Sequence, residues 1–82
     1  MWKAKVHITL KKSVLDPQGK TIQHALISLG YDKLREVRMG KYAELRLEAD
    51  SQEEALRQIK EMCERLLANP VIEDYRIEIE SV

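Results

Sequence analysis

Residues 2–10 read WKAKVHITL and alternate cleanly between apolar and polar side chains. One face of this segment carries the apolar side chains of Trp2, Ala4, Val6, Ile8 and Leu10, and the other face carries Lys3, Lys5, His7 and Thr9, followed by Lys11. A period of two residues is typical of a β-strand with one buried face. The rest of the fold is inferred outward from this predicted strand.

A turn and a helix are predicted after the first strand. Asp16 can accept a backbone hydrogen bond at a helix start, Pro17 fixes its own φ, and Gly19 relieves strain in the turn. Gly30 stands where a left-handed residue often ends a helix. Between these signals, apolar residues recur at helical spacing, at Ile22, Ala25, Leu26 and Leu29. The pattern therefore predicts a helix over about residues 18–29.

Two further strands and a second helix are predicted in the remainder of the chain. Residues 34–41 form a weak strand pattern, with Gly40–Lys41 as a hairpin turn or bulge, and residues 42–49 alternate cleanly. Ser51 and Glu54 have the spacing of a capping box at a helix start. Asn69–Pro70 is expected to end that helix, and residues 74–80 alternate as a last strand. The second helix is predicted to bury a stripe of Ala55, Leu56, Ile59, Met62, Cys63, Leu66 and Leu67.

The element order β-α-β-β-α-β predicts one α+β domain over residues 1–82. It is typical of a ferredoxin-like sandwich, in which two helices cover one face of a four-stranded antiparallel sheet. In that topology the first strand is central, so Lys3 and Lys5 are expected to face acidic side chains of neighbouring strands, namely Glu44, Glu48, Asp74, Glu78 and Glu80.

Composition excludes several classes of protein. The 82 residues are 44% hydrophobic and 34% charged, which favours a folded chain over a disordered one. Fourteen basic residues balance fourteen acidic ones, which argues against a nonspecific grip on nucleic acid or anionic lipid. No apolar run approaches the ~20 residues of a membrane span, and a cytoplasmic location is expected. The single cysteine excludes a disulfide framework within the chain.

The residues needed for catalysis are not grouped in the sequence. His7 and His24 lie in different elements and are expected to be exposed, whereas Cys63 is expected to be a buried core residue. The absence of Phe argues against an RNA-binding sheet face. The loop at residues 11–19 has one glycine and no arginine, which argues against an acylphosphatase-type phosphate loop. The residues alone therefore predict a small noncatalytic module.

Three stretches carry a more specific signal. They are residues 14–20 (VLDPQGK), residues 37–41 (VRMGK) and residues 62–75 (MCERLLANPVIEDY). Together they resemble the PurS family, the small subunits of phosphoribosylformylglycinamidine (FGAM) synthase. The resemblance extends over essentially the whole chain.

The resemblance implies a role in de novo purine synthesis. The assembled enzyme converts formylglycinamide ribonucleotide, glutamine and ATP to formylglycinamidine ribonucleotide, glutamate, ADP and phosphate. A large PurL-type synthetase uses ATP and Mg, and a PurQ-type glutaminase releases ammonia. The PurS subunit is implied to be noncatalytic and to bind no cofactor or metal. It is implied to bridge the two larger subunits, to support ammonia transfer, and to self-associate as a dimer or a dimer of dimers.

A bridging subunit needs rigid, specific surfaces, and the predicted turns supply them. Sheet edges are an expected route to self-association, because an exposed edge strand pairs readily with a copy of itself. Glycine and proline at the turns have ordinary backbone explanations as well. The candidate partner-contact residues are Lys11, Lys12, Asp16, Pro17, Gln18, Gly19, Arg38, Gly40, Lys41, Asn69 and Pro70.

Two other functions are compatible with a small ferredoxin-like domain. A dimeric regulatory module would have a saturable site for a small metabolite, and an autonomous enzyme would turn over without partners. The family-like stretches argue against the regulatory module. The missing nucleophile and metal motifs argue against the enzyme.

Overall fold

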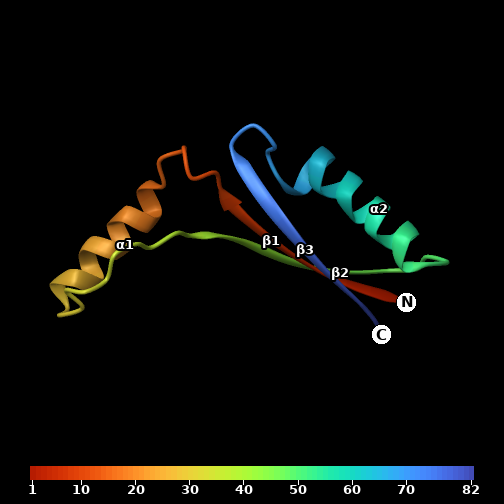
Figure 1. The fold of residues 1–82 in the computed structure, drawn as a ribbon, viewed down its shortest axis with the longest axis horizontal. Helices are drawn as coiled ribbons and strands as arrows, with labels where there is room; N and C mark the ends of the chain where they lie inside the picture. The colour runs from red at the N-terminus through yellow and green to blue at the C-terminus, as the bar shows by residue number, and fades with distance from the viewer.

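The computed structural model describes residues 1–82 and has an α+β fold, as predicted (Figure 1). Neither of its α-helices has the length and apolar character needed to cross a membrane. In chain order the elements are β1 (Trp2–Leu10), α1 (Pro17–Ser28), β2 (Gly40–Leu47), α2 (Gln52–Met62), a π-helical turn η1 (Cys63–Leu67) and β3 (Glu73–Ser81).

The sheet has three antiparallel strands in the order β2-β1-β3, so β1 is central, as predicted. Val6 lies opposite Ala43 on β2 and Ile77 on β3, which places apolar side chains of all three strands on one face. On the other face, Lys3 Nζ lies 3.2 Å from Glu44 and Lys5 Nζ lies 3.9 Å from Glu80. These pairs confirm the expected charge complementarity for Glu44 and Glu80, and each is worth a few tenths of a kcal/mol. Glu48 lies beyond the end of β2, and Asp74 pairs with Lys11 instead.

The core lies between the apolar face of the sheet and α2. Trp2 closes one end of it, because its indole Nε1 donates a 3.1 Å hydrogen bond to the Ala49 carbonyl. Cys63 is fully buried, which confirms its predicted place in the core. The buried side chains are Ala4, Val6, Ile8, Ala55, Ile59, Cys63 and Ala68.

Helix α2 begins at the predicted cap. The Ser51 hydroxyl accepts a 3.1 Å hydrogen bond from the Glu54 N–H, but the reciprocal half of the capping box is not formed. The Glu54 carboxylate instead accepts hydrogen bonds from the side chains of Arg57 and Gln58. The helical path ends at Leu67, one residue short of the predicted Asn69–Pro70 stop. The prediction that Leu66 is buried in the stripe of this helix is wrong, because Leu66 is 84% exposed.

The predicted strand over residues 34–41 is wrong. Residues 34–39 have no strand partner. Two of their backbone groups bond to side chains instead: the Arg35 carbonyl accepts from Gln23, and the Met39 N–H donates to Asp16. Gly40–Lys41 is not a hairpin turn or a bulge. Both residues lie within β2, where Gly40 pairs with Thr9.

The chain therefore does not form the predicted four-stranded ferredoxin-like sandwich. Helix α2 alone covers the sheet, while α1 projects away from it together with the segment that returns to β2 (Figure 1). We call residues 17–39 the α1 arm. The predicted apolar stripe of α1 is consequently not a core stripe: Ala25 is exposed, and Leu29 is 75% exposed.

The arm gives the chain an elongated shape. The principal extents are 51 × 27 × 14 Å and the radius of gyration is 16.2 Å. A compact chain of this length would have a radius of gyration of about 12 Å. The single core between the sheet and α2 thus carries most of the tertiary stability, and the arm contributes little to it.

Replacing Ile59 with alanine should lower the free energy of unfolding by about 2–5 kcal/mol, because Ile59 is fully buried between α2 and the sheet. The matched control is Val71→Ala, which removes an apolar side chain that is 80% exposed and should change stability by less than about 0.5 kcal/mol. Urea denaturation at one protein concentration measures both. Equal effects of the two substitutions would contradict the assigned core.

Candidate functional site

Most of the predicted partner-contact residues gather at one end of the sheet, where β1 ends and both β2 and β3 begin. The register pairs Thr9 with Gly40 and Leu10 with Glu73 at this end. We call it the loop end. Two clusters of hydrogen bonds organise it, one centred on Asp16 and one on Glu73.

Asp16 joins the start of α1 to the segment that leads into β2. Its Oδ1 accepts a 2.9 Å hydrogen bond from the Gly19 N–H, and its Oδ2 accepts a 2.9 Å hydrogen bond from the Met39 N–H. These two hydrogen bonds, with a smaller contribution from the nearby Arg38 charge, lower the pKa of Asp16. The carboxylate is thus a structural clamp between segments far apart in the sequence.

The two candidate glycines at the loop end are required by close backbone approach. A Cβ on Gly19 would lie 2.4 Å from both the Val37 carbonyl oxygen and Asp16 Oδ2. A Cβ on Gly40 would lie 2.3 Å from the Ile8 carbonyl oxygen. Both glycines therefore have a structural explanation. Beside them, Pro17 occupies the first turn of α1 and is exposed, as is Gln18.

Arg38 is partly buried, and its guanidinium donates a hydrogen bond to the Leu10 carbonyl at the end of β1. It also lines a cavity of about 420 Å³ between the β1–α1 loop and the α1 arm. Lys12, Lys20 and Arg35 line the same cavity. Sequence reasoning selected Lys12 and Arg38 but missed Lys20 and Arg35, because no local motif reveals that α1 lies beside residues 35–38.

Glu73 holds the second cluster. Its Oε1 accepts a 2.7 Å hydrogen bond from the Asn69 N–H, and its Oε2 lies 3.4 Å from Lys41 Nζ. Asn69 Oδ1 accepts a hydrogen bond from the Val71 N–H, which leaves Pro70 exposed within a tight turn. Glu73 was missed because the predicted last strand began at Asp74, and no local motif shows that Glu73 reaches Asn69 and Lys41.

Lys11 is the remaining candidate residue of the loop end. Its Nζ lies 3.6 Å from Asp74, and its backbone N–H donates a 2.8 Å hydrogen bond to the Ile72 carbonyl. Lys11 and Lys41 are thus paired with carboxylates of the chain itself. Lys12, which also precedes α1, has no such partner.

Two groups with a raised pKa, Cys63 and Tyr75, lie away from the loop end cavity. Burial, with a smaller effect of Glu64, raises the pKa of the Cys63 thiol. A 2.7 Å hydrogen bond from the Tyr75 hydroxyl to Glu64 raises the pKa of Tyr75 to about 12. Neither side chain therefore has an ionised form available near neutral pH.

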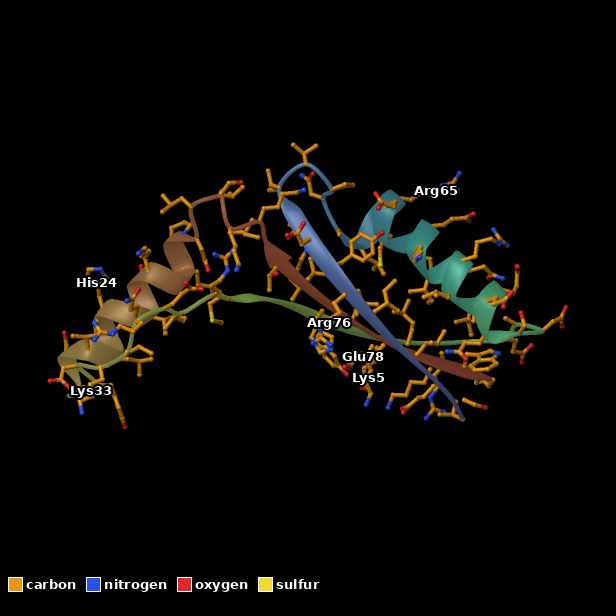
Figure 2. All side chains as sticks on the ribbon, viewed as in Figure 1. Lys5, His24, Lys33, Arg65, Arg76 and Glu78 are labelled. Atoms are coloured by element: carbon orange, nitrogen blue, oxygen red, sulfur yellow. The ribbon has the colours of Figure 1, made fainter.

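Neither histidine belongs to a group that could hold a metal ion. His24 lies exposed on α1, as predicted, and its side chain points away from the sheet (Figure 2). His7 is only half-exposed, and its Nε2 lies 3.2 Å from Glu78 on the outer face of the sheet.

The loop end offers rigid turns, held by the Asp16 and Glu73 clusters, and charged side chains, and both features suit contact with another protein.

Asp16→Asn should destabilise the chain at pH 7, because an amide oxygen can satisfy only one of the two N–H donors. A lowered native-state pKa means that the contribution of the carboxylate is present above its unfolded pKa and is lost as pH falls through its native pKa. The stability difference between wild type and Asp16→Asn should therefore shrink below about pH 4. Urea denaturation between neutral and acid pH measures it.

The matched control for this experiment is Asp32→Asn, in an exposed loop. That substitution should have little effect at any pH. A deficit for Asp16→Asn that stays constant down to acid pH would contradict the proposed clamp.

Comparison with known proteins adds independent findings. A family model described as PurS, phosphoribosylformylglycinamidine (FGAM) synthase, matches residues 3–81. The PurS subunit of phosphoribosylformylglycinamidine synthase from Bacillus subtilis (strain 168) is 57% identical over 83 residues, which cover 100% of this chain and 96% of the relative.

Solved structures agree with the sequence matches. PurS from Methanocaldococcus jannaschii, described as one of the subunits of formylglycinamide ribonucleotide amidotransferase in the purine biosynthetic pathway, matches with a TM-score of 0.91 at 46% identity, covering 100% of this chain and 99% of that one. A chain of PurLQS from Thermotoga maritima matches with a TM-score of 0.89 at 33% identity, covering 96% of each chain. The chain therefore belongs to the PurS family of phosphoribosylformylglycinamidine synthase subunits.

Proposed function

We propose that the chain is a noncatalytic assembly subunit of FGAM synthase. It bridges the PurL-type synthetase and the PurQ-type glutaminase, and it supports ammonia transfer from glutamine to formylglycinamide ribonucleotide. The observation that carries this proposal is the match to a chain of PurLQS over nearly its whole length. Membership of the family does not favour the alternative of a regulatory metabolite-binding module.

The geometry of the loop end supports a bridging role. Its turns are fixed by the Asp16 and Glu73 clusters, so a partner would meet a preformed surface that loses little conformational entropy on binding. On this proposal the chain binds no cofactor, while ATP and Mg are used by the large subunit. The complex would work in the cytoplasm, where purine nucleotides are made.

Self-association is the second part of the proposal, and the α1 arm supports it. The chain exposes 6132 Å² of surface. A compact monomer of its mass would expose about 5,100 Å². The excess of roughly 1,000 Å² is similar to the ~800 Å² that each partner buries in a standard interface. A second copy that covers the apolar face of α1 would account for this area.

The edges of the sheet offer a further route from a dimer to a dimer of dimers. Strands β2 and β3 each pair only with β1, so each has one free edge. Backbone groups along such an edge can pair with a strand of another copy.

The double substitution Leu26→Glu/Leu29→Glu should convert the dimer to a monomer, because it places two charges in the apolar stripe of α1. Light scattering coupled to gel filtration measures the mass. Val71→Glu is the control, since it changes an exposed apolar residue outside the arm and should leave the mass unchanged. A double variant that keeps the wild-type mass would exclude the arm as the interface.

The bridging role is tested by reconstitution. Glutamine-dependent synthesis of formylglycinamidine ribonucleotide by the synthetase and glutaminase should require this chain, whereas ammonia-dependent synthesis by the synthetase alone should not. The expected result is that adding the chain restores only the glutamine-driven reaction. An unchanged glutamine-driven rate, with the ammonia control active, would remove the main support for the proposal.

A further inference from the structure

We propose that the cavity lined by Lys12, Lys20, Arg35 and Arg38 binds an acidic segment of a partner subunit. We call it the cationic cavity. It lies beside the Asp16 clamp, between the β1–α1 loop and the α1 arm. This inference rests on the proposed bridging function and identifies one contact that would serve it.

The charge distribution of the chain singles out this cavity. Of the fourteen lysines and arginines, six have a carboxylate within 4.0 Å, which leaves eight without one. Four of these eight line the cationic cavity. The chain has no net charge, yet half of the cationic side chains that have no carboxylate partner lie in this one cavity. On the outer face of the sheet, by contrast, most charges are paired.

The acidic side chains of the cavity do not neutralise it. Two carboxylates, Asp16 and Glu36, line the cavity against the four cations. The Asp16 carboxylate already accepts hydrogen bonds from two backbone N–H groups. Glu36 forms no ion pair and is exposed. The cavity therefore keeps an excess of positive charge that an added carboxylate can complement.

The walls of the cavity are held in place before any ligand arrives. Arg38 donates to the Leu10 carbonyl, which fixes its guanidinium at the end of β1. Gln23 Nε2 donates a 3.1 Å hydrogen bond to the Arg35 carbonyl, which ties α1 to the opposite wall. Guanidinium groups present paired N–H donors that match the two oxygens of a carboxylate. A preformed site of this kind loses little entropy on binding.

The lining favours a protein segment over a small metabolite. Only three of the eleven lining residues are hydrophobic and none is aromatic, whereas sites for small molecules are lined mainly by apolar and aromatic side chains. Lys12, Lys20 and Arg35 are exposed, so their charges can reach a facing protein surface. The first turn of α1 has few donors left for a competing anion, because Pro17 has no N–H and the Asp16 side chain accepts the Gly19 N–H.

The test compares two double variants with the same change of charge. Lys12→Glu/Arg35→Glu reverses two charges of the cavity and leaves the Arg38 hydrogen bond intact. Lys60→Glu/Arg65→Glu reverses two unpaired, exposed cations outside the α1 arm, of which Arg65 lies at the end of the helical path that begins with α2 (Figure 2). Binding of each variant and of wild type to the separate synthetase and glutaminase subunits is measured by calorimetric titration at low and high salt.

The cavity variant should bind one of the two subunits at least roughly tenfold more weakly than wild type, with a smaller salt dependence. The control variant should bind like wild type. A neutral version, Lys12→Gln/Arg35→Gln, should give an intermediate loss, and circular dichroism should show that all variants are folded. The neutral version also provides the comparison if the charge-reversed variant does not fold.

Three results would overturn the inference. A specific acidic contact would be excluded if the cavity variant binds with the affinity of wild type, or if it loses no more affinity than the control variant. Phosphate binding is monitored by the amide chemical shifts of Lys12 and Lys20. If inorganic phosphate binds there saturably while subunit binding is unchanged, the cavity is a site for a small anion. If the wild-type chain binds neither subunit, the bridging function fails together with this inference. If the wild type binds and only the cavity variant shows no loss, the inference alone fails.

Discussion

The Asp16 carboxylate is the interaction on which the rest of the loop end depends. One oxygen starts α1 and the other holds the Met39 N–H, so a single side chain fixes both ends of the α1 arm against the sheet. Gly40 can then begin β2 directly beside Thr9. Gly19 has to be a glycine because the backbone at Val37 passes too close for a side chain. Loss of the carboxylate would therefore disturb the helix start, the return segment and the cationic cavity together.

Periodic patterns predicted the elements that pack on a core. The alternation in β1, most of β2 and β3, and the apolar stripe of α2 each reflect one buried face, and the structure contains these elements. Leu66 is the exception in the stripe, because it is 84% exposed in the π-helical turn. The weak pattern at Val37 and Met39 predicted a strand that is absent. Alternation shows that a segment is extended, but a strand also needs a partner, and here the partners are the side chains of Asp16 and Gln23.

The position of α1 and the full site could not be predicted from the sequence. An amphipathic stripe shows that Leu26 and Leu29 need cover, but it does not show whether their own sheet or another chain provides it. Residues with local backbone signals, such as Asp16 and Gly19, were found. Lys20, Arg35 and Glu73 were missed, because their roles arise only when distant segments meet.

The separation between a packed body and a projecting arm ties the folding of this chain to its assembly. A helix of twelve residues is marginal on its own in water, and α1 has almost no packing against its own sheet. On the proposed mode of assembly, mass action would therefore govern the order of the arm, while the body keeps its structure at any dilution. The hydrogen bonds that fix the walls of the cationic cavity, from Gln23 to the Arg35 carbonyl and from Arg38 to the Leu10 carbonyl, would then hold it in place only while the arm is ordered. The concentration of the subunit would in this way determine the fraction of chains whose arm is ordered and can bind a partner.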